Sequence, residues 1–256
     1  MKSNSGLILG LIVLAGLLTA APARAEDAPE SCQVPDYLLA SEGALPKVAE
    51  AIKSGHSLDI LVIGSRSSTI SPTPNMSDAT AYPGRLQIAL KQKLPQVAVN
   101  LSVEIQAKKT AEEVAAGMVK LMEGKKPTLV IWQTGTVDAM RSTDPDDFRS
   151  GVDEGVVALQ EAGADVVLMN PQYSPRTETM ISAPPYLDSM RVVAQQHDVP
   201  LFDRFAIMQH WNESGEFDLF STFHGIELAK RVHDCLGRAL SRFVIDAAHV
   251  NPAQQN

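Results

Sequence analysis

The chain has 256 residues, with 30 acidic and 22 basic side chains and a formal net charge of −8. This charge argues against binding of nucleic acid or other polyanions, and an aromatic content of 5% gives no sign of a stacking platform for sugars or bases. The length suits one α/β domain with a sizeable core.

The first 25 residues are predicted to be a secretory signal peptide. Lys2 gives a short positive start, an apolar run extends from Leu7 to Ala20, and Ala23-Arg24-Ala25 matches an A-x-A cleavage signal. The run is shorter than the roughly 20 residues that span a bilayer, and no later apolar stretch is long enough. An uncleaved short anchor is the alternative. We expect a periplasmic or secreted protein with no stable membrane span after cleavage near Ala25.

Three further parts are predicted from the rest of the chain. Residues 26–57 are expected to form an N-terminal arm and a first helix, residues 58–247 an α/β domain, and residues 248–256 a disordered tail. Cys32 and Cys235 are the only cysteines, and in an exported chain they predict a disulfide between the arm and the last helix. The alternative is that Cys235 is a small buried hydrophobe, because it shares a helical stripe with Leu228 and Val232.

Short apolar runs alternate with amphipathic segments. Strands that are buried on both faces are predicted at Leu58–Ile63, Val97–Val103, Thr128–Trp132, Ala164–Met169 and Pro200–Phe202. Helices are predicted at Arg85–Leu94, Ala111–Glu123, Pro145–Ala162, Tyr186–His197 and Gly225–Ala247. Asp144 as N-cap and Pro145 at the first helical position mark the start of the third helix. This alternation predicts a single doubly wound, flavodoxin-like parallel sheet of about five strands with helices on both faces.

The functional site of such a sheet lies at the carboxyl ends of its strands. The relevant loops follow Ile63 and Val103, span Gln133–Arg141 and Asn170–Arg176, and precede the last helix at His224. In the first of them, Gly64 is followed by a hydroxyl-rich turn from Ser65 to Thr69, where an α/β protein presents a nucleophile or binds an anion. The alternative is that these hydroxyls only cap the turn.

The loops, in this order, resemble the SGNH hydrolases, the GDSL esterase superfamily, and in particular an exported bacterial branch of it. The four blocks of that family correspond to Gly64–Thr69, Asn100–Ala107, Gly135-Thr136-Val137-Asp138 and Ser221-Thr222-Phe223-His224. The likeness extends to Cys32–Pro35, Tyr82-Pro83, Ile131–Gln133, Asn170–Tyr173 and Arg204–Trp211, so that it covers most of Cys32–Leu240.

The resemblance implies a serine nucleophile, with His224 as its base. Two residues after Gly64 stands Arg66, which stays protonated and cannot attack a carbonyl. If Arg66 is an inserted residue, Ser67 becomes the nucleophile, and Ser65 is a further alternative at this position. Ser221 stands where the family has the acid that orients the histidine, and Asp218 could replace it.

Other positions differ from the pattern that the family implies for oxyanion stabilisation. Val137 stands where an asparagine amide would donate, and no glycine lies between Arg85 and Ala116. The residues expected to contact a ligand in the cleft are Gly64, Arg66, Ser68, Gly135, Thr136 and Arg176. Arg141 could line the same cleft, but we interpret it as surface charge.

These departures favour a protein of the carbohydrate or small-ester esterase class with impaired or lost hydrolysis, which binds a ligand or partner in the cleft. The alternative is an active serine esterase, or an O-acyl (acetyl) esterase or transferase on envelope glycans, that uses Ser67 and His224. Flavodoxin-like binding of a phosphorylated cofactor is a third hypothesis, which export disfavours. The expected ligand is a small-molecule or glycan ester, an envelope protein is a further candidate partner, and no cofactor, metal or nucleic acid is expected.

Overall fold

The structure is a computed structural model that describes residues 32–71, 78–220 and 225–249. The predicted signal peptide and most of the predicted tail lie outside the described residues, as do Ser221 and His224. Within the described part, no helix is long and apolar enough to cross a membrane.

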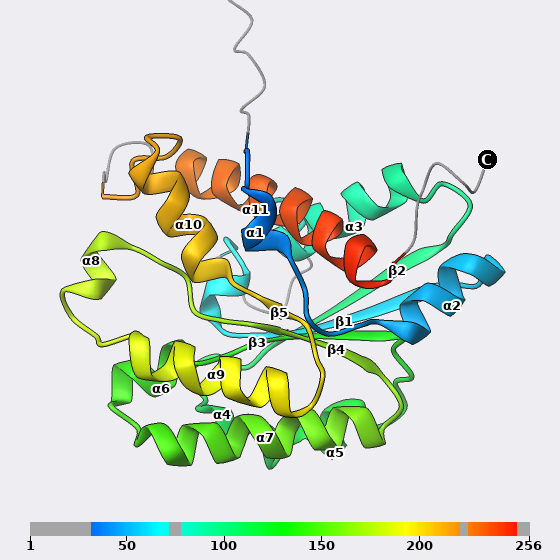
Figure 1. Cartoon of the computed structure of the whole chain (residues 1–256), viewed down its shortest axis with the longest axis horizontal. Coiled ribbons are helices and arrows are strands. Elements are labelled where there is room, and N and C mark those ends of the chain that lie inside the picture. Colours follow the sequence, from blue (N-terminus) through cyan, green and yellow to red (C-terminus); the bar gives the residue numbers. More distant parts are fainter. Residues whose placement is uncertain (1–31, 72–77, 221–224, 250–256) are drawn as a thin grey trace, which may run out of the picture. The chain divides into compact units, whose positions relative to one another are not determined.

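Five parallel strands form one sheet (Figure 1). They are β1 (Leu58–Gly64), β2 (Val99–Ile105), β3 (Leu129–Gln133), β4 (Asp165–Met169) and β5 (Leu201–Phe202), in the order β2-β1-β3-β4-β5. All five predicted strands are present, and the flavodoxin-like fold class is confirmed. The expected burial on both faces is wrong for β2, because β2 is an edge strand in which only Val99 is buried. Every residue of β3 and β4 is buried, because helices cover both faces of these central strands.

The register of the strands brings their carboxyl ends together. Gly64 of β1 lies opposite Ile105 of β2, and Gln133 of β3 lies opposite Met169 of β4. From β1 the chain adds β2 on one side of the sheet, and then β3, β4 and β5 on the other side. The boundary between β1 and β3 is therefore a topological switch point, where parallel sheets have a crevice for ligands. The loops after β1 and β3 therefore lie side by side at this edge.

One face of the sheet is covered by α3 (Tyr82–Lys93), α10 (Arg204–Glu213) and α11 (Gly225–Ala247), together with α1 (Asp36–Leu39) and α2 (Pro46–Ser54) (Figure 1). Their apolar residues form one core cluster with the side chains of β1, β3 and β4 that point to this face. In this cluster α3 and α11 approach closely, because a Cβ on Gly237 would lie only 2.4 Å from Cβ of Arg85.

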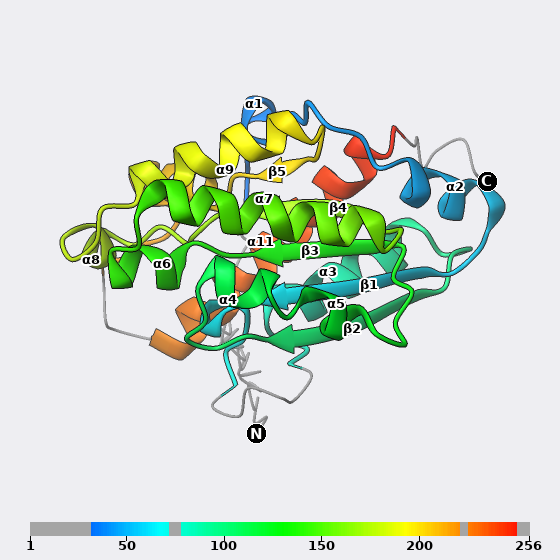
Figure 2. The ribbon, with the colours of Figure 1, turned by 90° about the horizontal axis from the view of Figure 1, so that it is seen from below.

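The other face carries α4 (Ala111–Ala115), α5 (Met118–Met122), α6 (Thr136–Arg141), α7 (Pro145–Glu161) and α9 (Pro184–Gln196). Figure 2 looks onto this face and shows α9, α7 and the α4–α5 pair side by side across the strands. The ring of Trp132 fills the space beside Gly155 of α7, where a Cβ would lie 2.3 Å from the ring. The short helix α8 (Pro175–Glu178) belongs to the loop after β4.

Local sequence explains where several helices begin and end. As predicted, Asp144 caps α7, with its side chain accepting from the N–H of Asp146 at 2.8 Å, and Pro145 follows at the first helical position. The single helix predicted at Ala111–Glu123 is instead divided into α4 and α5 at Gly117, a residue that weakens a helix interior. Helices α6, α8 and α10 were not predicted.

The predicted disulfide between Cys32 and Cys235 is present, with 5.4 Å between the two Cα atoms. It joins the segment before α1 to the middle of α11. Cys235 is also fully buried, so it serves the core in addition to the bond. Such a bond is typical of proteins in an oxidising compartment.

Candidate active site

A cavity of about 850 Å³ opens at the predicted edge of the sheet. Four of the five loops that the sequence placed there contribute to its lining, with Ser67 after β1, Lys108 after β2, Thr136 after β3 and Gln172 after β4, and the loop of His224 lies outside the described residues. Ile226, in the first turn of α11, also lines the cavity. The cavity is therefore the site that the strand order predicts.

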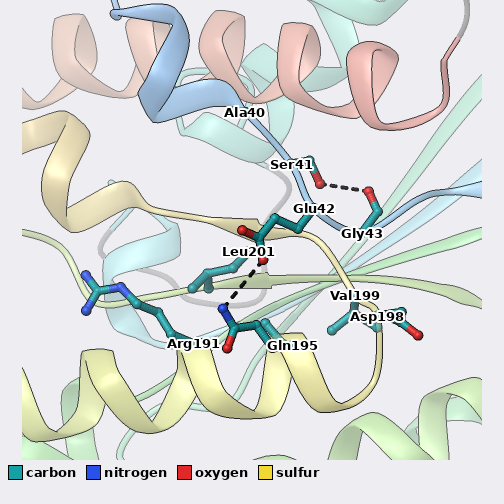
Figure 3. Close-up of a pocket in the computed structure, with 10 residues that line it drawn as sticks. Ala40, Ser41, Glu42, Gly43, Arg191, Gln195, Asp198, Val199 and Leu201 are labelled. Carbon is teal, nitrogen blue, oxygen red and sulfur yellow. Dashed lines mark hydrogen bonds between the residues drawn. The ribbon is translucent and has the colours of Figure 1, made fainter.

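A second, smaller cavity of about 260 Å³ lies beside the edge strand β5, between the segment before α2 and helix α9 (Figure 3). Glu42 and Gln195 form a hydrogen bond across it, and Arg191 extends along its side. None of the residues that the sequence proposes for catalysis lines this cavity.

The turn after β1 is tightly folded onto the end of the strand. A 3-10 turn, η1 (Arg66–Ser68), begins directly after Ser65, whose side chain caps it by accepting from the N–H of Ser67. A Cβ on Gly64 would lie 2.2 Å from Oγ of Ser68. Gly64 therefore lets the turn fold back so that Ser68 packs against the end of β1, and Gly64 itself does not line the large cavity.

The side chain of Gln133, at the end of β3, gathers the hydroxyl groups of this turn. Its Oε1 accepts from the N–H of Ser65 at 2.9 Å, and it lies 2.8 Å from Oγ of Ser65, 3.1 Å from Oγ of Ser68 and 3.4 Å from Oγ of Ser67. Gln133 is only 2% exposed, so this network is shielded from water. Ser65 and Ser68 are buried with it, whereas Ser67 remains partly exposed and lines the cavity.

Arg204, the first residue of α10, lies fully buried beneath Ser67. Its Nη1 donates to Oγ of Ser67 at 3.1 Å, and its Nη2 donates to the carbonyl of Ser67 and to Oε1 of Gln172. The guanidinium carbon also lies 5.5 Å from the ring centre of Tyr82. Among the ion pairs between described residues, none involves Arg204, which leaves its charge without a carboxylate.

Burial lowers the pKa of Arg204 to about 10, so the guanidinium is still charged at neutral pH. This residue was not singled out from the sequence. One indication of its importance was present in the sequence, because Arg204 begins the Arg204–Trp211 segment that resembles the SGNH hydrolases and closely follows a short predicted strand.

His233 of α11 also lines the cavity and lies beside Tyr82, with 5.9 Å between the two ring centres. Its Nδ1 accepts from the backbone N–H of Tyr82 at 2.9 Å, while the Tyr82 hydroxyl meets Oγ of Ser68 at 2.9 Å. Burial, and then the charge of Arg204, lower the pKa of His233 to about 3, against a smaller opposing effect of Asp78. His233 is therefore neutral at physiological pH and caps the first turn of α3.

Acidification is expected to destabilise the protein through His233. The unfolded chain binds a proton at this histidine below its ordinary pKa of 6.5, whereas the folded chain does so only near 3, so stability falls as the pH falls through this window. His233→Gln keeps an acceptor for the Tyr82 N–H but does not titrate. We expect urea unfolding at pH 7 and pH 5 to show a smaller loss of stability in this variant than in the wild type.

The control for this experiment is His56→Gln, which removes an exposed histidine. Its loss of stability between the two pH values should match that of the wild type. An unchanged loss in His233→Gln would contradict the assignment. Asp78 does not interfere, because hydrogen bonds from Thr80, Ile70 and Ser71 outweigh its desolvation and hold its pKa at about 2.

The other residues proposed from the sequence lie in different environments. Arg66 is exposed and lines the cavity, and its Nη1 donates to the carbonyl of Ser71 at 2.6 Å. Thr136 lines the cavity too, with its Oγ1 buried and without a partner among the described residues. Gly135 has a φ of 92° and precedes α6, a backbone conformation that glycine adopts without strain.

Arg141 and Arg176 lie in different surroundings. Arg141 lines the cavity, with its Nη1 3.1 Å from Glu113 and its Nη2 2.7 Å from the carbonyl of Lys108. Arg176 lies over the ring of Phe220, 5.4 Å from its centre, and is not among the cavity residues.

Asp218 is exposed, and its Oδ1 accepts from the N–H of Phe220. The expected base His224, and Ser221 before it, lie outside the described residues.

The fold matches that of solved structures of esterases. TesA aligns with a TM-score of 0.55 and 18% identity, over 72% of this chain and 98% of that chain. The psychrotrophic esterase EstA from Pseudoalteromonas sp. gives 0.55 and 18%, over 73% and 99%. A catalytic mutant of Axe2, an acetylxylan esterase from Geobacillus stearothermophilus, gives 0.57 and 15%, over 73% and 94%. The chain therefore shares the α/β fold of these esterases.

A sequence model assigns the chain more narrowly. The model of the non-GDSL lipase-like family matches residues 31–250, and the chain belongs to this family. No curated protein matches the chain in sequence.

Proposed function

We propose that this protein is a slow serine ester hydrolase that uses the hydroxyl of Ser67 as its nucleophile. The observation that carries the proposal is the contact between Oγ of Ser67 and the buried guanidinium of Arg204, at 3.1 Å. A fixed positive charge beside a hydroxyl oxygen stabilises the negative charge that develops there when the proton leaves. Ser67 also lies in the turn directly after β1, where it borders the cavity.

The reaction would follow the usual two steps of a serine hydrolase. Oγ of Ser67 attacks the ester carbonyl, its proton passes to a base, and the alcohol leaves with a proton to give an acyl-serine. Water then attacks the acyl group and restores the hydroxyl. Arg66 is unsuited to the first step because a guanidinium stays protonated, and its Nη1 is engaged by the carbonyl of Ser71.

The base must be a group other than the near neighbours of Ser67. The amide oxygen of Gln133 does not take up a proton at neutral pH, and His233, with a pKa of about 3 and its Nδ1 engaged by Tyr82, is too weak a base. The resemblance to SGNH hydrolases assigns this role to His224, and we retain that assignment as part of the proposal.

Slow turnover follows from the residue at position 137. Val137 lines the cavity with an apolar side chain at the position where the resemblance implies an asparagine amide. Loss of one donor to the oxyanion lowers the rate by about 10²- to 10³-fold. The same residue supports a second candidate function, binding of an ester-like ligand without turnover.

Export is part of the proposed function. The Cys32–Cys235 disulfide and the predicted signal peptide both support an oxidising location such as the periplasm or the exterior.

Covalent labelling is the test of the proposed nucleophile. A fluorophosphonate probe is expected to modify Ser67 of the wild type, as located by peptide mass spectrometry, and to leave Ser67→Ala unmodified. Ser65→Ala is the matched control, because it removes a neighbouring hydroxyl of the same network and should retain the label. A folded wild type that resists labelling would exclude hydrolysis at Ser67 and leave the binding function.

Release of 4-nitrophenol from 4-nitrophenyl butyrate gives a second readout. We expect weak hydrolysis by the wild type that disappears in Ser67→Ala. Equal rates in the two proteins would contradict the proposal.

A further inference from the structure

The cavity beside Ser67 carries positive charge in an acidic protein. Arg66, Lys108 and Arg141 line it, and no aspartate or glutamate is among its described lining residues. The whole chain has a formal charge of −8, so the local sign is opposite to the global one. A chance sample of this surface would be expected to contain more acidic than basic side chains.

Two of these cations have charge available for a ligand. Lys108 is exposed, and none of the hydrogen bonds or ion pairs between described residues involves its ammonium group. Its backbone, with a φ of 63°, turns sharply between β2 and α4. Arg66 is also exposed and uses one Nη atom on its own loop. Arg141 contributes less, because Glu113 lies 3.1 Å from its Nη1.

Arg204 adds a buried positive charge beneath the cavity. Arg204 is fully buried without a carboxylate partner among the described residues, and its Nη1 contacts Ser67 from below. Because the surrounding protein screens charge less than water does, Arg204 adds to the positive potential at the reacting hydroxyl. An anionic substrate would therefore be attracted both to the opening and to the floor of the cavity.

Apolar side chains form the remaining wall. Met140 of α6 and Ile226 of α11 line the cavity and are 66% and 54% exposed, and Val137 lines it too. Exposed apolar groups at the side of a polar site bind short alkyl chains. The combination of two exposed cations with this wall suits a molecule that has both an alkyl chain and an anionic group.

We propose that the esters accepted by this cavity carry a carboxylate on a short alkyl chain. This inference rests on the proposed hydrolysis at Ser67, and it adds the class of substrate. The ester carbonyl lies at Ser67, the alkyl chain lies along Met140 and Ile226, and the carboxylate lies near Arg66 and Lys108.

The test compares two substrates that differ in one charge. Mono-4-nitrophenyl adipate carries a free carboxylate at the far end of its acyl chain, and its methyl ester is the neutral counterpart. We expect kcat/KM of the wild type to be about tenfold higher for the acid, mainly through a lower KM, because partly exposed ion pairs each contribute modestly. The preference for the acid should shrink at about 0.5 M salt, because salt at this concentration screens the attraction between exposed charges.

Variants locate the origin of this preference. Arg66→Met and Lys108→Met are each expected to reduce the ratio of the two kcat/KM values about threefold, because only the charged ester loses an ion pair. Lys120→Met, which removes an exposed lysine on α5 away from the cavity, is the matched control and should keep the full ratio. Equal kcat/KM values for the two esters in the wild type would overturn the inference.

Failure of the proposed function would give a different result. If neither ester is hydrolysed, calorimetric titration with monomethyl adipate and dimethyl adipate decides the inference without catalysis. Tighter binding of the monoester, lost in Lys108→Met and kept in Lys120→Met, would support an anion-selective cavity. Equal or absent binding of the two compounds would overturn it.

Discussion

Removal of the Cys32–Cys235 disulfide is expected to lower the free energy of unfolding by about 5 kcal/mol, in the chain-entropy model of cross-links. The two residues are separated by 203 positions, so the bond closes nearly the whole folded chain into one loop. Without it, the unfolded chain gains conformational freedom that the folded chain does not. The segment before α1 would also lose its covalent attachment to α11.

Denaturant unfolding of a double variant measures this effect. Cys32→Ser and Cys235→Ala suit the two positions, because Cys235 is fully buried and alanine adds no polar group to the core. Reduced wild type should unfold at the same denaturant concentration as the double variant, which controls for the side-chain changes. A loss below about 1 kcal/mol would show that the bond adds little to the constraint on the unfolded chain.

Replacement of Arg204 by methionine is expected to lower kcat/KM for a 4-nitrophenyl ester roughly 10²-fold, which corresponds to the loss of one hydrogen bond from a charged group to the reacting oxygen. The fold should remain intact. The change removes a buried charge that lacks a carboxylate, which favours stability, but it also leaves the carbonyl of Ser67 and Oε1 of Gln172 without their donor. These contributions oppose each other.

Two further variants separate the charge from its geometry. Arg204→Lys keeps a cation but cannot contact Ser67 and Gln172 through a planar fork, so we expect an intermediate rate. Arg149→Met removes an exposed arginine of α7 and should leave kcat/KM unchanged. If Arg204→Met is folded by circular dichroism and as active as the wild type, the guanidinium has no part in the reaction.

Most strands of this fold could be predicted because they are short apolar runs between turn residues, whereas β2, at the edge of the sheet, alternates apolar and polar residues. The helices were less accessible to prediction where tertiary contacts decide their ends. Helix α10 begins with Arg204, a buried arginine whose hydrogen bonds Ser67 and Gln172 accept. A charged residue at a buried position interrupts the apolar pattern by which a buried helix is recognised in a sequence. The division of α4 from α5 depends on Gly117, whose effect in a helix varies with its surroundings.

The location of the site could also be predicted, but the buried charged and titratable side chains beneath it could not. The position of the cavity follows from strand order alone. The contacts of Arg204 with Ser67 span 137 positions, and that of His233 with Tyr82 spans 151. No local pattern links residues so far apart, and an arginine or histidine in a helix is ordinarily a surface residue.

The position of α11 in the chain has a consequence for the order in which the protein matures. In this last helix, Cys235 forms the disulfide, His233 caps the start of α3, and Ile226 lines the cavity. All five strands precede it, so a chain still emerging from the ribosome or the export channel can pair its sheet before any of these contacts exists. The hydrolysis that we propose for Ser67 would then depend on a late step, the docking of α11, because a chain with a paired sheet but an undocked α11 lacks the cavity wall at Ile226.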